Sequence, residues 1–61
     1  METQFVKGEI YSKEDIENKG FVLSKQTNNL IFYRNGDILL AFEISKTYNA
    51  TTLNLLSVII D

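Results

Sequence analysis

Four acidic side chains near the start of the chain form its densest group of ionisable residues: Glu9, Glu14, Asp15 and Glu17. Carboxylate oxygens in such a group could hold a divalent cation or imitate the phosphates of a nucleic acid. Their spacing is not that of an EF-hand loop, and Lys13 and Lys19 lie among them. We interpret the group as the solvated face of a helix, with a functional acidic surface as the alternative.

Four aromatic side chains could stack on the bases of a single-stranded nucleic acid: Tyr11, Phe32, Tyr33 and Tyr48. That mode of binding needs a basic groove around the rings. The chain offers only Arg34 and five scattered lysines, and its formal net charge is −2. Because phosphate neutralisation needs clustered cations, we expect these rings to pack in the core or at an interface.

Groups for covalent or acid–base catalysis are few, because the chain has no histidine and no cysteine. Its serines, tyrosines, lysines and carboxylates therefore lack the usual activating base and the commonest metal ligands. None is spaced as a known catalytic motif, and the chain is too short to enclose a pocket of the usual size. The sequence predicts a protein that is not an enzyme and that binds no cofactor or metal.

Length sets the next constraint. Sixty-one residues form a single domain, residues 1–61, and a chain of this size buries only about 60% of the surface that its unfolded form exposes. Without disulfides, extra stability must come from oligomerisation or from an unusually apolar core. No run approaches the roughly 20 apolar residues of a membrane span, and no signal peptide is visible. We expect a cytoplasmic protein with no membrane partner.

The elements that would position these residues centre on Leu30–Ile44. Two apolar runs flank Asn35-Gly36, which is a strong signal for a β-hairpin with these two residues in its loop. Arg34 would then face Asp37, and alternate residues would share a face of the sheet. One predicted face carries Ile31, Tyr33, Ile38, Leu40, Phe42 and Ile44. The other carries Leu30, Phe32, Leu39 and Ala41, with Arg34, Asp37 and Glu43 at its ends. Both faces are apolar, so both need cover.

The segments around the hairpin predict further elements: a strand at Phe5–Lys7, a helix at Lys13–Lys19, a strand at Phe21–Lys25, a turn at Ser45–Thr47 and a short edge strand at Tyr48–Ala50. Ser12 is suited to cap the start of the helix, and Gly20 is suited to the left-handed residue that follows its end. Ile16 is placed to contact Tyr11 at one end of the helix and Phe21 at the other.

The final segment, Thr52–Asp61, is assigned by periodicity. At 100° per residue its polar side chains fall on one narrow arc, whereas at 180° they are mixed between both faces. We predict a helix, although the β-branched run Val58-Ile59-Ile60 favours a strand. The predicted fold class is α+β, a small antiparallel β-meander of three to five strands with a short N-terminal helix and an apolar C-terminal helix.

This architecture has more apolar surface than one copy can cover. A helix that is apolar nearly all round must be buried on all sides, and so small a domain has no second layer for it. We therefore predict a homodimer or another partner-binding surface. The predicted interface residues are Leu30, Phe32, Leu39, Leu53, Leu55, Leu56, Ile59 and Ile60.

The segments Gly8–Ile16, Gly20-Phe21 and Ile31–Asp37 together resemble short accessory proteins encoded by phages and prophages of low-GC Gram-positive bacteria. The resemblance implies a role without catalysis, in which such proteins bind a host enzyme or defence component and block it, often as dimers. It assigns no catalytic or binding residues. We expect a non-catalytic protein–protein interaction module, a phage-encoded stoichiometric inhibitor of a host defence protein that acts as a homodimer. The alternatives are a self-associating structural subunit and, as the least favoured, a small nucleic-acid-binding protein.

Overall fold

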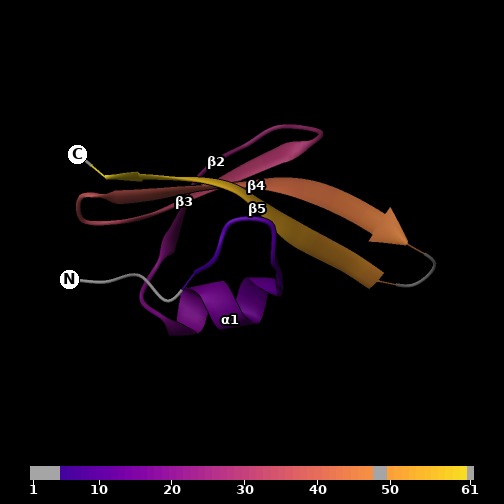
Figure 1. Cartoon of the computed structure of the whole chain (residues 1–61), viewed down its shortest axis with the longest axis horizontal. Helices are drawn as coiled ribbons and strands as arrows, with labels where there is room; N and C mark the ends of the chain where they lie inside the picture. Colours follow the sequence, from indigo (N-terminus) through magenta and orange to yellow (C-terminus); the bar gives the residue numbers. More distant parts are fainter. Residues whose placement is uncertain (1–4, 48–49, 61) are drawn as a thin grey trace.

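The structure, a computed structural model, describes residues 5–47 and 50–60 of the chain. Its elements in chain order are β1 (Ile10–Tyr11), α1 (Lys13–Asn18), β2 (Val22–Gln26), β3 (Leu30–Asn35), β4 (Ile38–Thr47) and β5 (Ala50–Ile60). The five strands form one antiparallel sheet in the order β1-β5-β4-β3-β2. The helix α1 lies against one face of this sheet, which we term the inner face (Figure 1). The opposite face is termed the outer face.

The path of the chain explains why α1 covers the inner face. Strands β2 to β5 follow one another as a meander, but β1 lies at the far edge, where Ile10 pairs with Asn54 and Tyr11 with Leu53. Leaving β1, the chain must pass from this edge to β2 at the other edge. The segment that makes this crossing contains α1, and Figure 1 shows it beneath the strands.

The helix begins at the predicted residue, Lys13, and ends at Asn18, one residue before the predicted end. The Ser12 hydroxyl accepts a hydrogen bond from the Asp15 backbone N–H at 3.1 Å, which confirms Ser12 as the N-cap. Gly20 follows the helix with φ of +91°, and its N–H donates to the Glu17 carbonyl at 3.0 Å. Ile16 is the only fully buried residue of α1. A helix of six residues is not stable alone, so this contact with the sheet holds it in place.

The core lies between α1 and the inner face. Its buried members are Phe5, Ile16, Phe21, Ile31, Tyr33, Leu40, Phe42, Leu53 and Leu55, and the half-buried Tyr11, Ile38, Ile44 and Val58 pack against them. Phe5 contacts three rings edge-on, those of Tyr11, Phe21 and Phe42, at centroid distances of 4.8, 5.3 and 6.3 Å. This aromatic cluster fills the space beside α1 that a helix of six residues leaves.

The predicted C-terminal helix is wrong, and with it the predicted fold class. Residues Ala50–Ile60 form the longest strand, β5, which pairs with β4 over its whole length. Among the described residues the only helix is α1, and no helix is long and apolar enough to cross a membrane. The molecule is a five-stranded antiparallel sheet with one short helix, in which β4 and β5 extend beyond the other strands (Figure 1).

A β-bulge explains why the period of β5 was misread. Phe42 pairs with Leu55 and the preceding Ala41 pairs with Ser57, so Leu56 is an extra residue on β5. Before the bulge Leu53 and Leu55 face the core. After it, Val58 and Ile60 pair with the inner-face residues Leu40 and Ile38, so they point to the inner side, where Val58 packs against the core and Ile60 is exposed. One inserted residue therefore shifts the alternation by one position and hides the period of two.

The central hairpin forms as predicted, but its loop residues were assigned wrongly. Asn35 pairs with Ile38, so the two loop residues are Gly36 and Asp37. Gly36 has φ of +60°, and a positive φ at the first loop position is shared by the type I′ and II′ turns that join tight hairpins. Arg34 consequently lies opposite Leu39, not Asp37. Because this register differs from the predicted one by two residues, the side chains assigned to each face remain the same.

Three further predictions near the strand ends are wrong, two in the type of element and one in its bounds. Phe5–Lys7 is not a strand. Phe5 lies outside the sheet with its side chain in the core, and the first strand is Ile10–Tyr11. Strand β2 begins at Val22 and not at Phe21, which is buried. Ser45–Thr47 is not a turn but the end of β4. The predicted edge strand at Tyr48–Ala50 lies partly outside the described residues, and Ala50 begins β5.

Candidate protein-interaction surface

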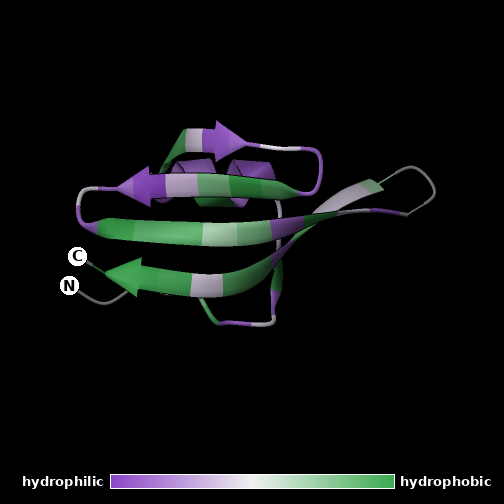
Figure 2. Cartoon of the chain, turned by 90° about the horizontal axis from the view of Figure 1, so that it is seen from above, coloured by the Kyte–Doolittle hydropathy of each residue, from purple (hydrophilic) through white to green (hydrophobic). Residues whose placement is uncertain are grey.

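The outer face of the sheet is not covered by any element among residues 5–47 and 50–60. Figure 2 looks onto this face, with the four long strands in front and α1 behind them. Apolar segments, drawn in green, run along β3, β4 and β5. An antiparallel sheet that faces water usually alternates apolar and polar residues, and this one has apolar residues on both sides.

Strand pairing arranges the outer-face side chains in rows that cross the sheet, because directly paired residues point to the same side. The first row is Val22, Arg34, Leu39 and Ile59; the second is Lys25, Phe32, Ala41 and Ser57. We term these two rows the outer-face patch. Phe32 and Leu39 at its centre are half-buried by their neighbours, whereas Val22 and Ile59 at its margins are exposed. The patch spans β2 to β5 and presents an apolar strip.

A shallow hollow lies within the outer-face patch. It has a volume of about 300 Å³ and is lined by Ser24, Lys25, Phe32, Arg34 and Leu39. Ser24 is the extra residue of a second β-bulge, since Leu23 pairs with Tyr33 and the next pair along β2 is Lys25 with Phe32. The bulge places Lys25 beside Phe32, so the hollow has an apolar floor and two cationic side chains at its rim. The Arg34 guanidinium also donates a hydrogen bond to the Gly36 carbonyl at 3.1 Å.

The next row toward the other end of the sheet is more polar. It contains Leu30, Glu43, Asn54 and Ile10. Among the described residues, no hydrogen-bond donor meets the buried Oδ1 atom of Asn54. A buried acceptor without a donor lowers stability. This row marks the end of the outer-face patch, because Glu43 and Asn54 interrupt the apolar surface there.

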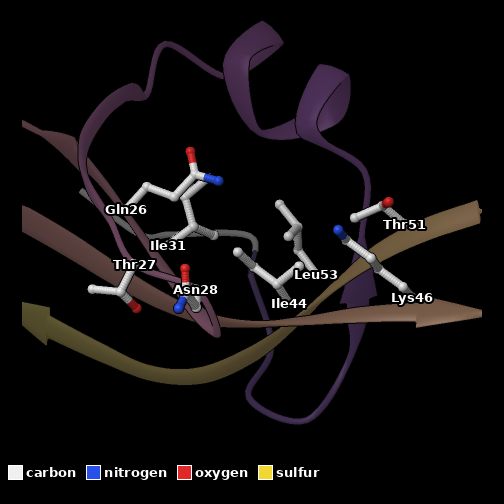
Figure 3. A pocket seen from close by; sticks show the side chains of 8 residues that line it. All are labelled: Gln26, Thr27, Asn28, Ile31, Ile44, Lys46, Thr51 and Leu53. Atoms are coloured by element: carbon white, nitrogen blue, oxygen red, sulfur yellow. The ribbon is translucent and has the colours of Figure 1, made fainter.

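A second hollow opens on the inner face, where β4 and β5 extend past α1 (Figure 3). It has a volume of about 380 Å³ and is lined by Gln26, Thr27, Asn28, Ile31, Ile44, Lys46, Thr51 and Leu53. Ile31 and Leu53 are already buried in the core, so a ligand would cover little new apolar surface there. The polar side chains around it are exposed. This hollow is therefore poorly suited to bind a small molecule, and the outer-face patch is the better candidate site, for a protein.

The predicted interface residues fall into three groups. Leu30, Phe32 and Leu39 lie half-buried on the outer face, as the predicted hairpin faces require. Leu53 and Leu55 are buried in the core, so they cannot contact a partner directly. The remaining three, Leu56, Ile59 and Ile60, are exposed along β5. Val22 and Lys25 were not predicted, because the bulge at Ser24 hides the face to which the β2 residues point. Arg34 was assigned to the correct face of the hairpin but was not named as an interface residue.

Two other groups of side chains suggested other chemistry, the acidic residues and the aromatic rings. The four acidic residues are all exposed, and no cluster of three or more potential metal ligands occurs in the described ranges. Tyr11 and Tyr33 pack on the inner face, whereas Phe32 lies on the outer face, so these rings share no surface. Tyr48 lies outside the described residues.

Tyr33 links the sheet to α1. Its ring is fully buried, and its hydroxyl donates a hydrogen bond to Glu17 Oε2 at 3.2 Å. Burial raises the pKa of Tyr33 above its ordinary value of 10.0, and the hydrogen bond to the Glu17 carboxylate and its negative charge raise it further. A phenol with a raised pKa keeps its proton at neutral pH, so the Tyr33 hydroxyl remains a hydrogen-bond donor to Glu17.

Compared with protein-family models, with curated proteins and with solved structures, the chain has no significant match. The resemblance to phage accessory proteins stays a prediction.

Proposed function

We propose that this protein is a non-catalytic protein–protein interaction module that binds its partner through the outer-face patch. The observation that supports the proposal most directly is the pair of rows that place Phe32, Leu39, Ala41 and Ile59 on a face without cover. Contiguous apolar surface on a small domain is a common sign of a binding site. An aromatic and a leucine at the centre of such a patch are suited to anchor a partner.

The side chains of the patch also indicate the chemistry of the partner. The hollow between Phe32 and Leu39 would accept an apolar side chain, and Lys25 and Arg34 at its rim would attract a carboxylate. The chain as a whole is acidic, so this cationic end would orient the partner more than it would attract it from a distance. We therefore expect a protein that presents an apolar residue beside an aspartate or glutamate.

The finer role is part of the same proposal. The role of a phage-encoded stoichiometric inhibitor of a host defence protein is supported by the resemblance of its sequence segments, and non-catalytic binding is compatible with it. Such an inhibitor would act in the cytoplasm, as expected for a sequence without a visible signal peptide. A self-associating structural subunit is the second candidate, because residues 56–60 of β5 have a neighbouring strand on one side only within residues 5–47 and 50–60.

The test compares two lysine substitutions on the same strand and the same face. Leu39→Lys places a charge at the centre of the outer-face patch, whereas Ser45→Lys places it on the exposed end of β4, outside the patch. A protein captured by the tagged wild type from cells of the source organism is purified, and its affinity for each variant is measured by calorimetry. We expect a one-to-one complex, weakened at least about 30-fold by Leu39→Lys and less than about 3-fold by Ser45→Lys.

Circular dichroism of both variants checks that they fold. If folded Leu39→Lys binds the purified partner as tightly as the wild type does, the outer-face patch is not the binding surface. Lys25→Glu provides a second measurement: it should weaken the complex, and the wild-type affinity should fall as salt is added, if a carboxylate of the partner lies at the rim.

A further inference from the structure

One long edge of the sheet has no neighbouring strand among the described residues. Strand β1 pairs with β5 only at Leu53 and Asn54, and backbone hydrogen bonds from Gly8 and to Glu9 extend this contact as far as Leu55. The segment Leu56–Ile60 continues beyond it, paired with β4 on one side only. Figure 2 shows this end of β5 along the margin of the sheet. We term Leu56–Ile60 the β5 edge.

The two outer margins of the sheet differ in how they are protected against pairing with other chains. Strand β2 carries Lys25 and a bulge at Ser24, both of which discourage the addition of another strand. The β5 edge contains no ionisable side chain, and its one bulge lies at its start. Three of its five residues, Leu56, Ile59 and Ile60, are exposed large apolar side chains. The β5 edge therefore has the backbone and the side chains that favour strand addition.

We propose that two copies of this chain pair through the β5 edge, antiparallel about a two-fold axis near Val58, and so form one continuous sheet of ten strands. Antiparallel pairing about Val58 sets Leu56 opposite Ile60 of the partner subunit and Ser57 opposite Ile59 of the partner subunit. Residues that pair in this way point to the same side, so both faces continue across the junction. Within Leu56–Ile60 no like charges meet, so this segment is compatible with an isologous contact between two copies.

The side chains of the β5 edge favour pairing with a second copy of this chain over pairing with an unrelated strand. A partner with a charged strand would gain no complementary charge at the β5 edge, whereas the edge itself supplies an apolar, β-branched strand of equal length. Alternate residues of a strand direct their N–H and C=O groups to the same side, so roughly two or three of the five residues from each copy would form the new hydrogen bonds. The junction would be about 17 Å long, at 3.4 Å per residue.

So short a junction predicts a weak dimer. It is smaller than the standard interface of about 800 Å² per partner, so we expect dissociation constants on the order of tens to hundreds of micromolar. The β5 edge is a different surface from the centre of the outer-face patch. Pairing would place the outer-face patches of two copies on one side of a single sheet, so that one dimer could bind two partner molecules.

Sedimentation equilibrium over concentrations that span this range tests the proposal, with two substitutions matched in exposure. Ile60→Lys introduces a charge on the β5 edge at a side chain that is 65% exposed, and Val22→Lys introduces the same charge on β2 at one that is 66% exposed. We expect a reversible monomer–dimer equilibrium for the wild type. Ile60→Lys should weaken it at least about 10-fold, and Val22→Lys should leave it within about 2-fold.

Hydrogen exchange gives an independent readout of the paired segment. Backbone amides of Leu56–Ile60 should become more protected as the protein concentration rises, whereas those of β2 should not change. A wild type that stays monomeric over the whole range overturns the proposal, as does a dimer that Ile60→Lys leaves intact and Leu39→Lys abolishes. Amides of the β5 edge that are protected equally at every concentration would also overturn it, because another part of the same chain would then cover the edge.

Discussion

Ile16 is the contact on which α1 depends, and its truncation tests how the inner face is covered. The side chain is fully buried, and α1 has no other buried residue. Replacing a buried isoleucine by alanine costs about 2–5 kcal/mol of unfolding free energy, from lost burial and from the cavity that remains. At roughly 0.05–0.15 kcal/mol per residue, a chain of this length has about 3–9 kcal/mol in total. Ile16→Ala should therefore remove a large share of the stability.

Urea unfolding followed by circular dichroism measures this loss, with two variants for comparison. Ile16→Val removes one methylene group from the same site and should cost about 0.5–1.5 kcal/mol. Val22→Ala changes an exposed side chain on β2 and should change the stability by less than about 0.5 kcal/mol. The reasoning is refuted if Ile16→Ala costs less than about 1 kcal/mol, because α1 would then contribute little to the cover of the inner face.

Three further predictions concern single features of the fold. Tyr33→Phe removes the hydroxyl that donates to Glu17 and should cost about 0.5–1.5 kcal/mol at pH 7 in urea unfolding. Folding raises the pKa of Tyr33, so the stability that this group contributes is present below about pH 10 and is lost as the pH rises through the pKa of the folded state. The wild type should therefore lose more stability above pH 10 than Tyr33→Phe does. Deletion of Leu56 should preserve the fold, because it removes only the bulged residue of β5. The unfolding free energy should change by less than about 2 kcal/mol. Loss of the cross-strand contacts of β5 in NMR spectra would contradict this prediction. Ser12→Ala removes the N-cap and should cost about 0.5–2 kcal/mol, measured against Ser45→Ala as an exposed control.

The features that the sequence predicts well depend on neighbours in the chain. Ser12, Ile16 and Gly20 define α1 because capping and helix termination involve residues only a few positions apart. The two faces of the central hairpin follow from the alternation of its apolar residues, and they persist although the loop was misplaced by one residue. The positions of Phe32 and Leu39 on the outer face were predictable for the same reason.

The features that were missed depend on contacts between distant segments. The bulge at Leu56 is visible only once β5 is paired with β4, and without it the period of two could not be recognised. Strand β1 has two residues, too few for any pattern, and its position beside β5 depends on pairing with the opposite end of the chain. Lys25 and Val22 could not be assigned to the outer-face patch, because the bulge at Ser24 decides which way they point.

The pairing of β1 with β5 joins the first and last strands of the chain, and this has a consequence for the order of folding. Successive strands from β2 to β5 are separated by three residues or fewer in the sequence, so their contacts can form early and rapidly. Contact between β1 and β5 requires a loop that contains most of the chain, and its closure is entropically the most costly. Before that closure, α1 and Phe5 are not held against the sheet. A folding intermediate would therefore expose the aromatic residues of the inner face together with the apolar residues of the outer face. Irreversible aggregation during refolding should therefore compete with this last step, and it should decrease when refolding is carried out at lower protein concentration.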